Sequence, residues 1–103
     1  MEIIFEEEYL SELFFKGKCN DKKHRYQPDI VRKYQKAVVL LANAKQVEDL
    51  FEINSLNYEV LSGDKKGISS VRCGLKYRLE FKVSKENETL IICRLLELSN
   101  HYK

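Results

Sequence analysis

The sequence predicts an α+β fold, with helices packed on one face of a curved sheet. Two observations support this prediction. In the first half of the chain, apolar residues recur at helical spacing after a short apolar opening. From residue 56 onward apolar and polar residues alternate, as they do in strands with one face toward a core. The predicted order is therefore one strand, two helices and then a run of strands.

The first half is predicted to hold one strand and two helices. EIIF at 2–5 indicates a short strand, and residues 6–16 place apolar side chains at helical spacing until Gly17 can end the helix. After a polar loop, Pro28 and Asp29 suit the first turn of a second helix. One apolar stripe runs along that helix. Its members are Ile30, Tyr34, Val38, Leu41 and Ala44.

The second half is predicted to hold strands joined by turns. Residues 56–60 alternate as a strand with one wet face, and SGDKKG at 62–67 is a turn. Residues 71–83 alternate throughout, so we expect two antiparallel strands that meet at a central turn. Residues 89–98 are apolar at nearly every position, as in a central strand covered on both sides.

Composition limits the classes of protein. A chain of 103 residues with 44% hydrophobic and 33% charged residues suits a single domain, which we expect to span 1–103. The acidic start MEIIFEEEYL is unlike a signal peptide, and no apolar stretch could span a bilayer. We therefore expect a cytoplasmic protein without membrane contact. Cys19, Cys73 and Cys93 lack CxxC spacing, and with only two histidines no structural zinc site is expected.

The charges are unevenly distributed, although a net charge of +2 does not by itself indicate a nucleic-acid binder. Acidic residues gather near the N-terminus, while basic residues gather at 16–25, 64–66 and 72–82. These basic segments form one binding face only if they converge in space. Charge alone favours the alternative, in which they are ordinary solvated loops.

Three polar residues, Glu59, Arg72 and Arg78, occupy strand positions that point away from the predicted helices. A wet sheet face needs no function. Two arginines beside a carboxylate nevertheless fit a phosphate-handling surface, because the planar guanidinium matches phosphate oxygens. The alternative is that each arginine is a cross-strand partner of Glu59 or Glu80. On either interpretation the arginines are expected at the surface, where their loss costs little stability.

Residues 56–81, LNYEVLSGDKKGISSVRCGLKYRLEF, resemble the core signature of HigB-type toxins in the RelE/ParE superfamily of type II toxin–antitoxin systems. The signature is a strand, a Gly-Asp-basic-basic-Gly turn, a Ser-Val-Arg strand and a Tyr-Arg-Leu-x-Phe strand. The resemblance extends over nearly the whole chain. It implies a bacterial toxin with a RelE/ParE-like α+β fold, in which two N-terminal helices pack on one face of a small twisted antiparallel sheet.

The resemblance also implies an activity. Members of the family mostly cleave messenger RNA in the ribosomal decoding site, which inhibits translation, and they do so without a metal or other cofactor. The ribose 2′-hydroxyl attacks the adjacent phosphate, so the reaction needs a base, an acid and cations for the phosphorane. Glu59 stands where many members carry a His and would be the base. Arg72 and Arg78 match the family's sheet arginines and would stabilise the phosphorane.

The resemblance implies partners as well. These are the ribosome, messenger RNA and a cognate helix-turn-helix antitoxin, so the chain would be a monomer or part of an antitoxin-bound hetero-oligomer. Two rival functions remain open. One is a non-catalytic inhibitor that acts by binding, as the ParE branch does on DNA gyrase. The other is a degenerate toxin that only co-represses its operon together with the antitoxin.

The end of the chain, ELSNHYK, holds the remaining catalytic candidates. Family members frequently close on Asp-Tyr-His, whereas this chain has Asn100, His101 and Tyr102 before Lys103. His101 is the candidate proton carrier, and Tyr102 could donate a proton or stack on a base. The alternatives are a frayed terminal His and a Tyr that packs the last strand onto a helix. Because neighbouring residues on a strand face opposite sides, the exchanged order could point His101 away from the site.

Eight residues outside the catalytic set are candidates for RNA contact, because they are cationic or polar and fall in loops, turns or at the chain end. For the loop at 22–25 the alternative is an ordinary solvated loop, and for Lys65 and Lys66 it is a turn shaped by the neighbouring glycines. The candidates are Lys22, Lys23, His24, Arg25, Lys65, Lys66, Lys76 and Asn100.

Overall fold

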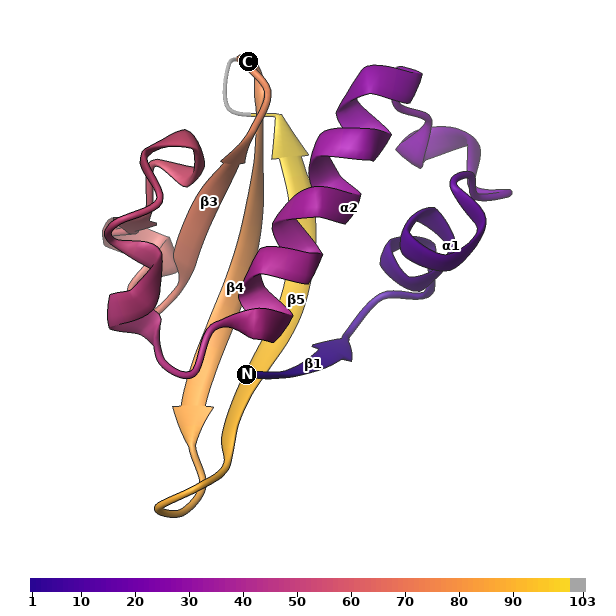
Figure 1. Cartoon of the computed structure of the whole chain (residues 1–103). Coiled ribbons are helices and arrows are strands. Elements are labelled where there is room, and N and C mark those ends of the chain that lie inside the picture. Colours follow the sequence, from indigo (N-terminus) through magenta and orange to yellow (C-terminus); the bar gives the residue numbers. More distant parts are fainter. Residues whose placement is uncertain (101–103) are drawn as a thin grey trace.

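The computed structural model describes residues 1–100 and shows an α+β fold, which confirms the predicted class (Figure 1). Five strands form one sheet in the order β1-β5-β4-β3-β2. Two α-helices, α1 (Glu8–Lys16) and α2 (Pro28–Asn43), cover one face of it. The strands are β1 (Glu2–Phe5), β2 (Glu59–Val60), β3 (Ser69–Cys73), β4 (Tyr77–Lys85) and β5 (Ile91–Asn100).

The sheet differs from the predicted antiparallel sheet at one edge. β1 pairs with β5 in parallel, from Glu2 opposite Ile92 to Phe5 opposite Leu95, whereas the other three strand pairs are antiparallel. A parallel pair needs a long crossover connection instead of a hairpin. Here both helices and three strands lie between β1 and β5, so nothing in the local sequence dictates the direction of the pair.

The end of the first helix and the start of the second lie where the sequence predicts, although α1 begins at Glu8 and not at residue 6. Gly17 follows α1 with φ 76, and its N–H donates to the Leu13 carbonyl, as expected of a glycine that ends a helix. Pro28 opens α2, and Asp29 lies in the first turn. Every member of the predicted apolar stripe is buried. The two helices are joined through Tyr34, which is fully buried and donates its hydroxyl to the Leu10 carbonyl at 2.7 Å.

The core lies between the helices and one face of the sheet. Alternating residues of β3 and β4 supply Val71, Cys73, Leu79 and Phe81, all of which are fully buried. Burial raises the pKa of the Cys73 thiol to about 12, so it stays protonated and packs as a small apolar side chain. The same alternation turns the intervening polar residues toward the face that the helices leave uncovered.

β5 is a central strand, as predicted, but it is not fully covered on both sides. Cys93, Leu95 and Leu98 are buried, whereas Ile92 and Leu96 are only half-buried. The spacing between Leu95 and Leu98 breaks strict alternation, and the register shifts at this point against β4. This bulge returns Leu98 to the core side, which explains why the strand is apolar at so many positions.

Within residues 1–100, no helix is long and apolar enough to cross a membrane.

Candidate active site on the open sheet face

Arg78 lies near the start of β4, on the sheet face that the helices leave uncovered, and it is only 5% exposed. Its Nε donates to the Ser70 hydroxyl at 2.7 Å. Its Nη2 donates to the Ser70 carbonyl and to the Asn57 carbonyl. The expectation of a surface arginine is therefore wrong for this residue. Because these contacts use Nε and Nη2, they hold the guanidinium plane in one orientation.

The loop before β2 contributes one of the acceptors that bind Arg78. The 3₁₀ turn Asn54–Leu56 ends at Asn57, which adopts the left-handed conformation with φ 43. Asparagine is one of the few residues besides glycine that adopt this conformation readily. The turn presents the Asn57 carbonyl to Arg78. Ser70 and Asn57 were not among the predicted site residues, since only the paired strands show that they meet Arg78.

Glu59 lies beside Arg78, as a shared site requires. Its carboxylate lies 3.7 Å from Nη2 of Arg78, and its side chain is 47% exposed. Glu59 reaches this position because β2 pairs with β3 in a register that sets Glu59 opposite Ser70. A half-exposed carboxylate beside a buried, fixed guanidinium can accept a proton from solvent or from a ligand.

Arg72 stands directly opposite Arg78 across β3 and β4. The two side chains start on the same face of the sheet, and directly opposed residues have Cβ atoms roughly 4.5–5.5 Å apart. Arg72 is exposed, unlike Arg78. Two like charges in directly opposed positions destabilise a strand pair, and here Glu59 offsets the charge of Arg78 while Arg72 joins none of the ion pairs found among residues 1–100. The arrangement is therefore suited to an anion such as a phosphate.

Lys65 is paired within the protein. Its ammonium lies 2.8 and 3.1 Å from the two carboxylate oxygens of Glu80, whose side chain is only 9% exposed. The hydrogen bond to Glu80 raises the pKa of Lys65. This contact ties the 3₁₀ turn Gly63–Lys65 to the open sheet face. Lys66, its neighbour in the same predicted basic turn, is exposed.

The basic loop before α2 has its own internal structure. Asp21 accepts a hydrogen bond from the Lys23 amide at 2.9 Å and contacts Nδ1 of His24 at 2.7 Å. The His24 ring stacks on Tyr9 with a centroid distance of 3.6 Å. The hydrogen bond from His24 lowers the pKa of Asp21. His24 therefore shapes the loop, while the cations around it, Lys22, Lys23 and Arg25, are exposed.

The end of β5 is tied down as far as the structure describes it. The Tyr26 hydroxyl donates to the Leu98 carbonyl at 2.8 Å, and the Leu98 amide donates to the Tyr9 hydroxyl at 3.1 Å. Burial raises the pKa of Tyr9 to about 12, so this hydroxyl stays neutral. Asn100 pairs with Tyr77 in the β4–β5 register. His101 and Tyr102 lie outside the described residues.

The register between β4 and β5 determines which residues of β4 lie beside the last described residues of β5. Ser99 lies opposite Arg78, and Asn100 lies opposite Tyr77. The last described residue is thus one position beyond the register position of the buried arginine. Of the other RNA-contact candidates, Lys76 is exposed in the turn between β3 and β4. Among residues 1–100, no group of three or more His, Cys, Asp or Glu side chains is arranged to hold a metal ion.

Comparison with known proteins supports the fold. Neither a family model nor a curated protein matches the sequence. Among solved structures, a YoeB/ParE toxin from Agrobacterium tumefaciens superimposes with a TM-score of 0.57 over 99% of this chain and 100% of that chain. The chain shares the fold of that toxin. Sequence identity between the two is 16%, so the likeness concerns the backbone and assigns no residue a role.

Proposed function

We propose that this chain is the toxin of a type II toxin–antitoxin system, of the HigB type, and that it acts as a ribosome-dependent messenger RNA endonuclease in the cytoplasm. The observation that carries the proposal is the opposition of Arg72 and Arg78, with Glu59 3.7 Å from Arg78. This group combines two phosphate-binding cations and a carboxylate on one open face. The shared backbone fold of a YoeB/ParE toxin supports the class.

The proposed reaction is attack of a ribose 2′-hydroxyl on the neighbouring phosphate. Glu59, which is half-exposed, takes the hydroxyl proton. Arg78 stabilises the phosphorane, and its contacts with Ser70 and Asn57 hold it in place before the RNA arrives. Arg72 binds the phosphate from the opposite strand position. A proton for the leaving oxygen comes from His101 or Tyr102, which follow the strand end beside Arg78.

The proposed partners are messenger RNA, the ribosome and a cognate helix-turn-helix antitoxin, with the chain as a monomer or in an antitoxin-bound hetero-oligomer. The exposed cations are the natural candidates for contact with ribosomal RNA, because such contacts draw on phosphate charge and not on sequence. Lys65 is a weaker candidate, since its ammonium is already bound by Glu80. The remaining exposed candidates are Lys22, Lys23, Arg25, Lys66 and Lys76.

A second candidate function is inhibition of DNA gyrase by binding, as in the ParE branch. One observation favours it: the Arg78 guanidinium is bound by Ser70 and Asn57, which gives it a role in holding the fold without any RNA. A toxin that only co-represses its operon is consistent with the same contacts.

The test is a reconstituted translation reaction. We expect the purified protein to cut the messenger RNA on translating ribosomes, with cleavage positions mapped by primer extension. Glu59→Gln and Arg72→Ala should each slow cutting, while Lys85→Ala, an exposed lysine at the far end of β4, should not. Intact messenger RNA together with inhibited supercoiling by purified gyrase would transfer the assignment to the binding inhibitor.

A further inference from the structure

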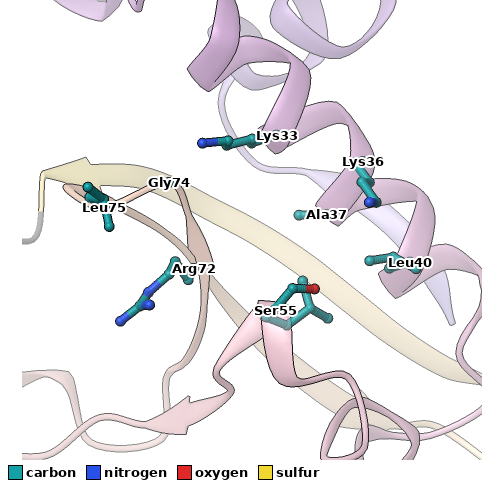
Figure 2. A pocket seen from close by; sticks show the side chains of 9 residues that line it. Lys33, Lys36, Ala37, Leu40, Ser55, Arg72, Gly74 and Leu75 are labelled. Carbon is teal, nitrogen blue, oxygen red and sulfur yellow. The ribbon is translucent and has the colours of Figure 1, made fainter.

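A basic cleft of about 310 Å³ lies between α2 and the turn that joins β3 to β4 (Figure 2). Lys33 and Lys36 line it from α2, and Arg72 lines it from β3. None of the described residues that line it is acidic. Its remaining walls are mostly apolar, from Ala37, Leu40, Leu56 and Leu75. The cleft therefore combines positive charge with an apolar lining.

The three cations have no anionic partner among residues 1–100. The ion pairs of the described chain join other residues. Lys33 and Lys36 are three positions apart on α2, so the two like charges share one side of the helix. Figure 2 shows Lys33 extending from α2 toward the turn at Gly74, while Arg72 extends away from α2. The two lysine charges on α2 repel each other modestly, and an anion bound between them would relieve this repulsion.

The turn between β3 and β4 forms one wall of the cleft, and it packs closely against α2. Gly74 has φ 86, and a Cβ at this position would lie 2.8 Å from Cδ1 of Ile30. Glycine therefore lets the turn close against α2. At the apex of the turn, Leu75 is 80% exposed, which is unusual for so large an apolar side chain. The cleft consequently has a fixed rim with an apolar side chain that nothing in residues 1–100 covers.

We infer that this cleft binds one nucleotide of single-stranded RNA, next to the phosphate held between Arg72 and Arg78. Lys33 and Lys36 bind the nucleotide's phosphate, and the base packs on Leu75 and the apolar wall. The choice of RNA rests on the proposed function. Arg72 connects the two places, because it lines the cleft and also stands opposite Arg78 on the sheet. A cleft of this size falls at the lower end of the range for small-ligand sites, as suits a single nucleotide.

An acidic amphipathic protein segment is the other ligand that a basic, apolar cleft could hold. The position of Arg72 favours RNA, because Arg72 both lines the cleft and stands opposite Arg78 on the sheet. A protein segment has no comparable reason to reach the sheet face.

The experiment is a titration of the ¹⁵N-labelled protein with a 5′-phosphorylated 2′-O-methyl tetra-adenylate. This probe lacks the 2′-hydroxyl that attacks the phosphate, so binding is read without cleavage. We expect the amide signals of Ser55, Gly74 and Leu75 to shift and saturate. Signals from the turn at 86–89, at the opposite end of β4, should stay unchanged.

Paired variants locate the contact. Lys33→Ala combined with Lys36→Ala should weaken binding and flatten its salt dependence by about 0.7 in the slope of log affinity against log salt, the value for one lost phosphate contact on a single strand. Arg32→Ala is the matched control, because Arg32 is an exposed cation on the same helix that does not line the cleft. Leu75→Ser should weaken binding without changing the slope, since it removes apolar contact only.

Three outcomes would overturn the inference. They are unshifted cleft signals, equal effects of the double lysine variant and Arg32→Ala, and a cleft that responds to a Glu- and Leu-rich helical peptide but not to the RNA. The last would identify a protein-docking surface. Failure of the proposed function has a separate signature, since messenger RNA would then stay intact on translating ribosomes while the cleft still binds the tetra-adenylate.

Discussion

The side chain of Arg78 donates through Nε to the Ser70 hydroxyl at 2.7 Å, and the two residues lie on adjacent strands. Ser70 is fully buried, as is nearly all of Arg78. The guanidinium thus stabilises the fold through its hydrogen bonds, in addition to its proposed role in the site. Arg72, directly opposite on β3, has the same charge but is exposed. The two arginines should consequently respond differently to mutation.

Arg78→Ala should destabilise the protein by about 1–3 kcal/mol, because it leaves the buried Ser70 without the donor that its hydroxyl accepts from and also removes the hydrogen bond to the Asn57 carbonyl. Arg72→Ala should change the free energy of unfolding by no more than about 0.5 kcal/mol, since the side chain is exposed. Urea unfolding of both variants at pH 7 measures the difference. Similar unfolding midpoints for the two variants would show that the Ser70 and Asn57 contacts contribute little.

Glu59→Gln should reduce the rate of messenger RNA cleavage by about 10²–10⁴-fold, as expected when a general base is removed. The amide keeps the size of the side chain, so folding should be unaffected. Glu97→Gln is the control, because Glu97 is an exposed carboxylate of β5 opposite Glu80. Single-turnover cleavage on translating ribosomes is the measurement. Equal rates for Glu59→Gln and Glu97→Gln would exclude Glu59 as the base.

Lys65→Met should destabilise the protein by about 1 kcal/mol at pH 7, because it leaves the carboxylate of Glu80 without its ammonium partner. Pairing raises the pKa of Lys65 above its unfolded value. The stabilisation is therefore fully present below about pH 10.4 and is lost as the pH rises through the raised pKa.

The control for this pair is Lys66→Met, which removes an exposed neighbouring charge. The difference in unfolding free energy between the two variants, followed from pH 7 upward, isolates the Lys65 contribution. It should shrink in strongly alkaline buffer. A difference that stayed constant across that range would argue against an ionic origin.

Cleavage should proceed without added metal beyond what the ribosome needs. Residues 1–100 offer no cluster of His, Cys, Asp and Glu that could hold an ion, and the proposed site supplies its positive charge through arginine. The measurement is cleavage with a chelator titrated below the level that dissociates ribosomes. Strong inhibition in that range, reversed by one added divalent metal, would contradict the proposed chemistry.

Deletion of 101–103 should abolish cleavage with little change in stability. The buried apolar side chains of β5 extend only to Leu98, which Tyr9 and Tyr26 hold through its backbone. His101→Ala and Tyr102→Phe then separate the two roles. If His101 transfers the proton, its variant should lose orders of magnitude in rate and Tyr102→Phe should lose less. Growth arrest by the truncated protein as strong as that by the full chain would remove the end of the chain from the site.

Local pattern determined most elements of this fold. The strand predicted over 56–60 is wrong in its bounds, because Asn54–Leu56 form a 3₁₀ turn and β2 spans only Glu59–Val60. The stripe along α2, the stop at Gly17 and the alternation through β3 and β4 could be predicted because each depends on neighbours a few residues away. Strand parity set Arg72 and Arg78 on one face, as predicted, whereas Glu59 lies close to Arg78 because β2 pairs with β3 in the register that sets Glu59 opposite Ser70.

Long-range pairing decided the rest. The parallel direction of β1 depends on β5, whose paired residues lie ninety positions later in the chain. Arg78 is bound by Ser70 of the neighbouring strand and by the Asn57 carbonyl from the loop before β2, and Lys65 is bound by Glu80 because a turn lies against the sheet. A sequence does not show whether a charged side chain is hydrated by water or hydrogen-bonded to a buried partner. Only the tertiary structure removes the water and so distinguishes a free cation from one the fold has already bound.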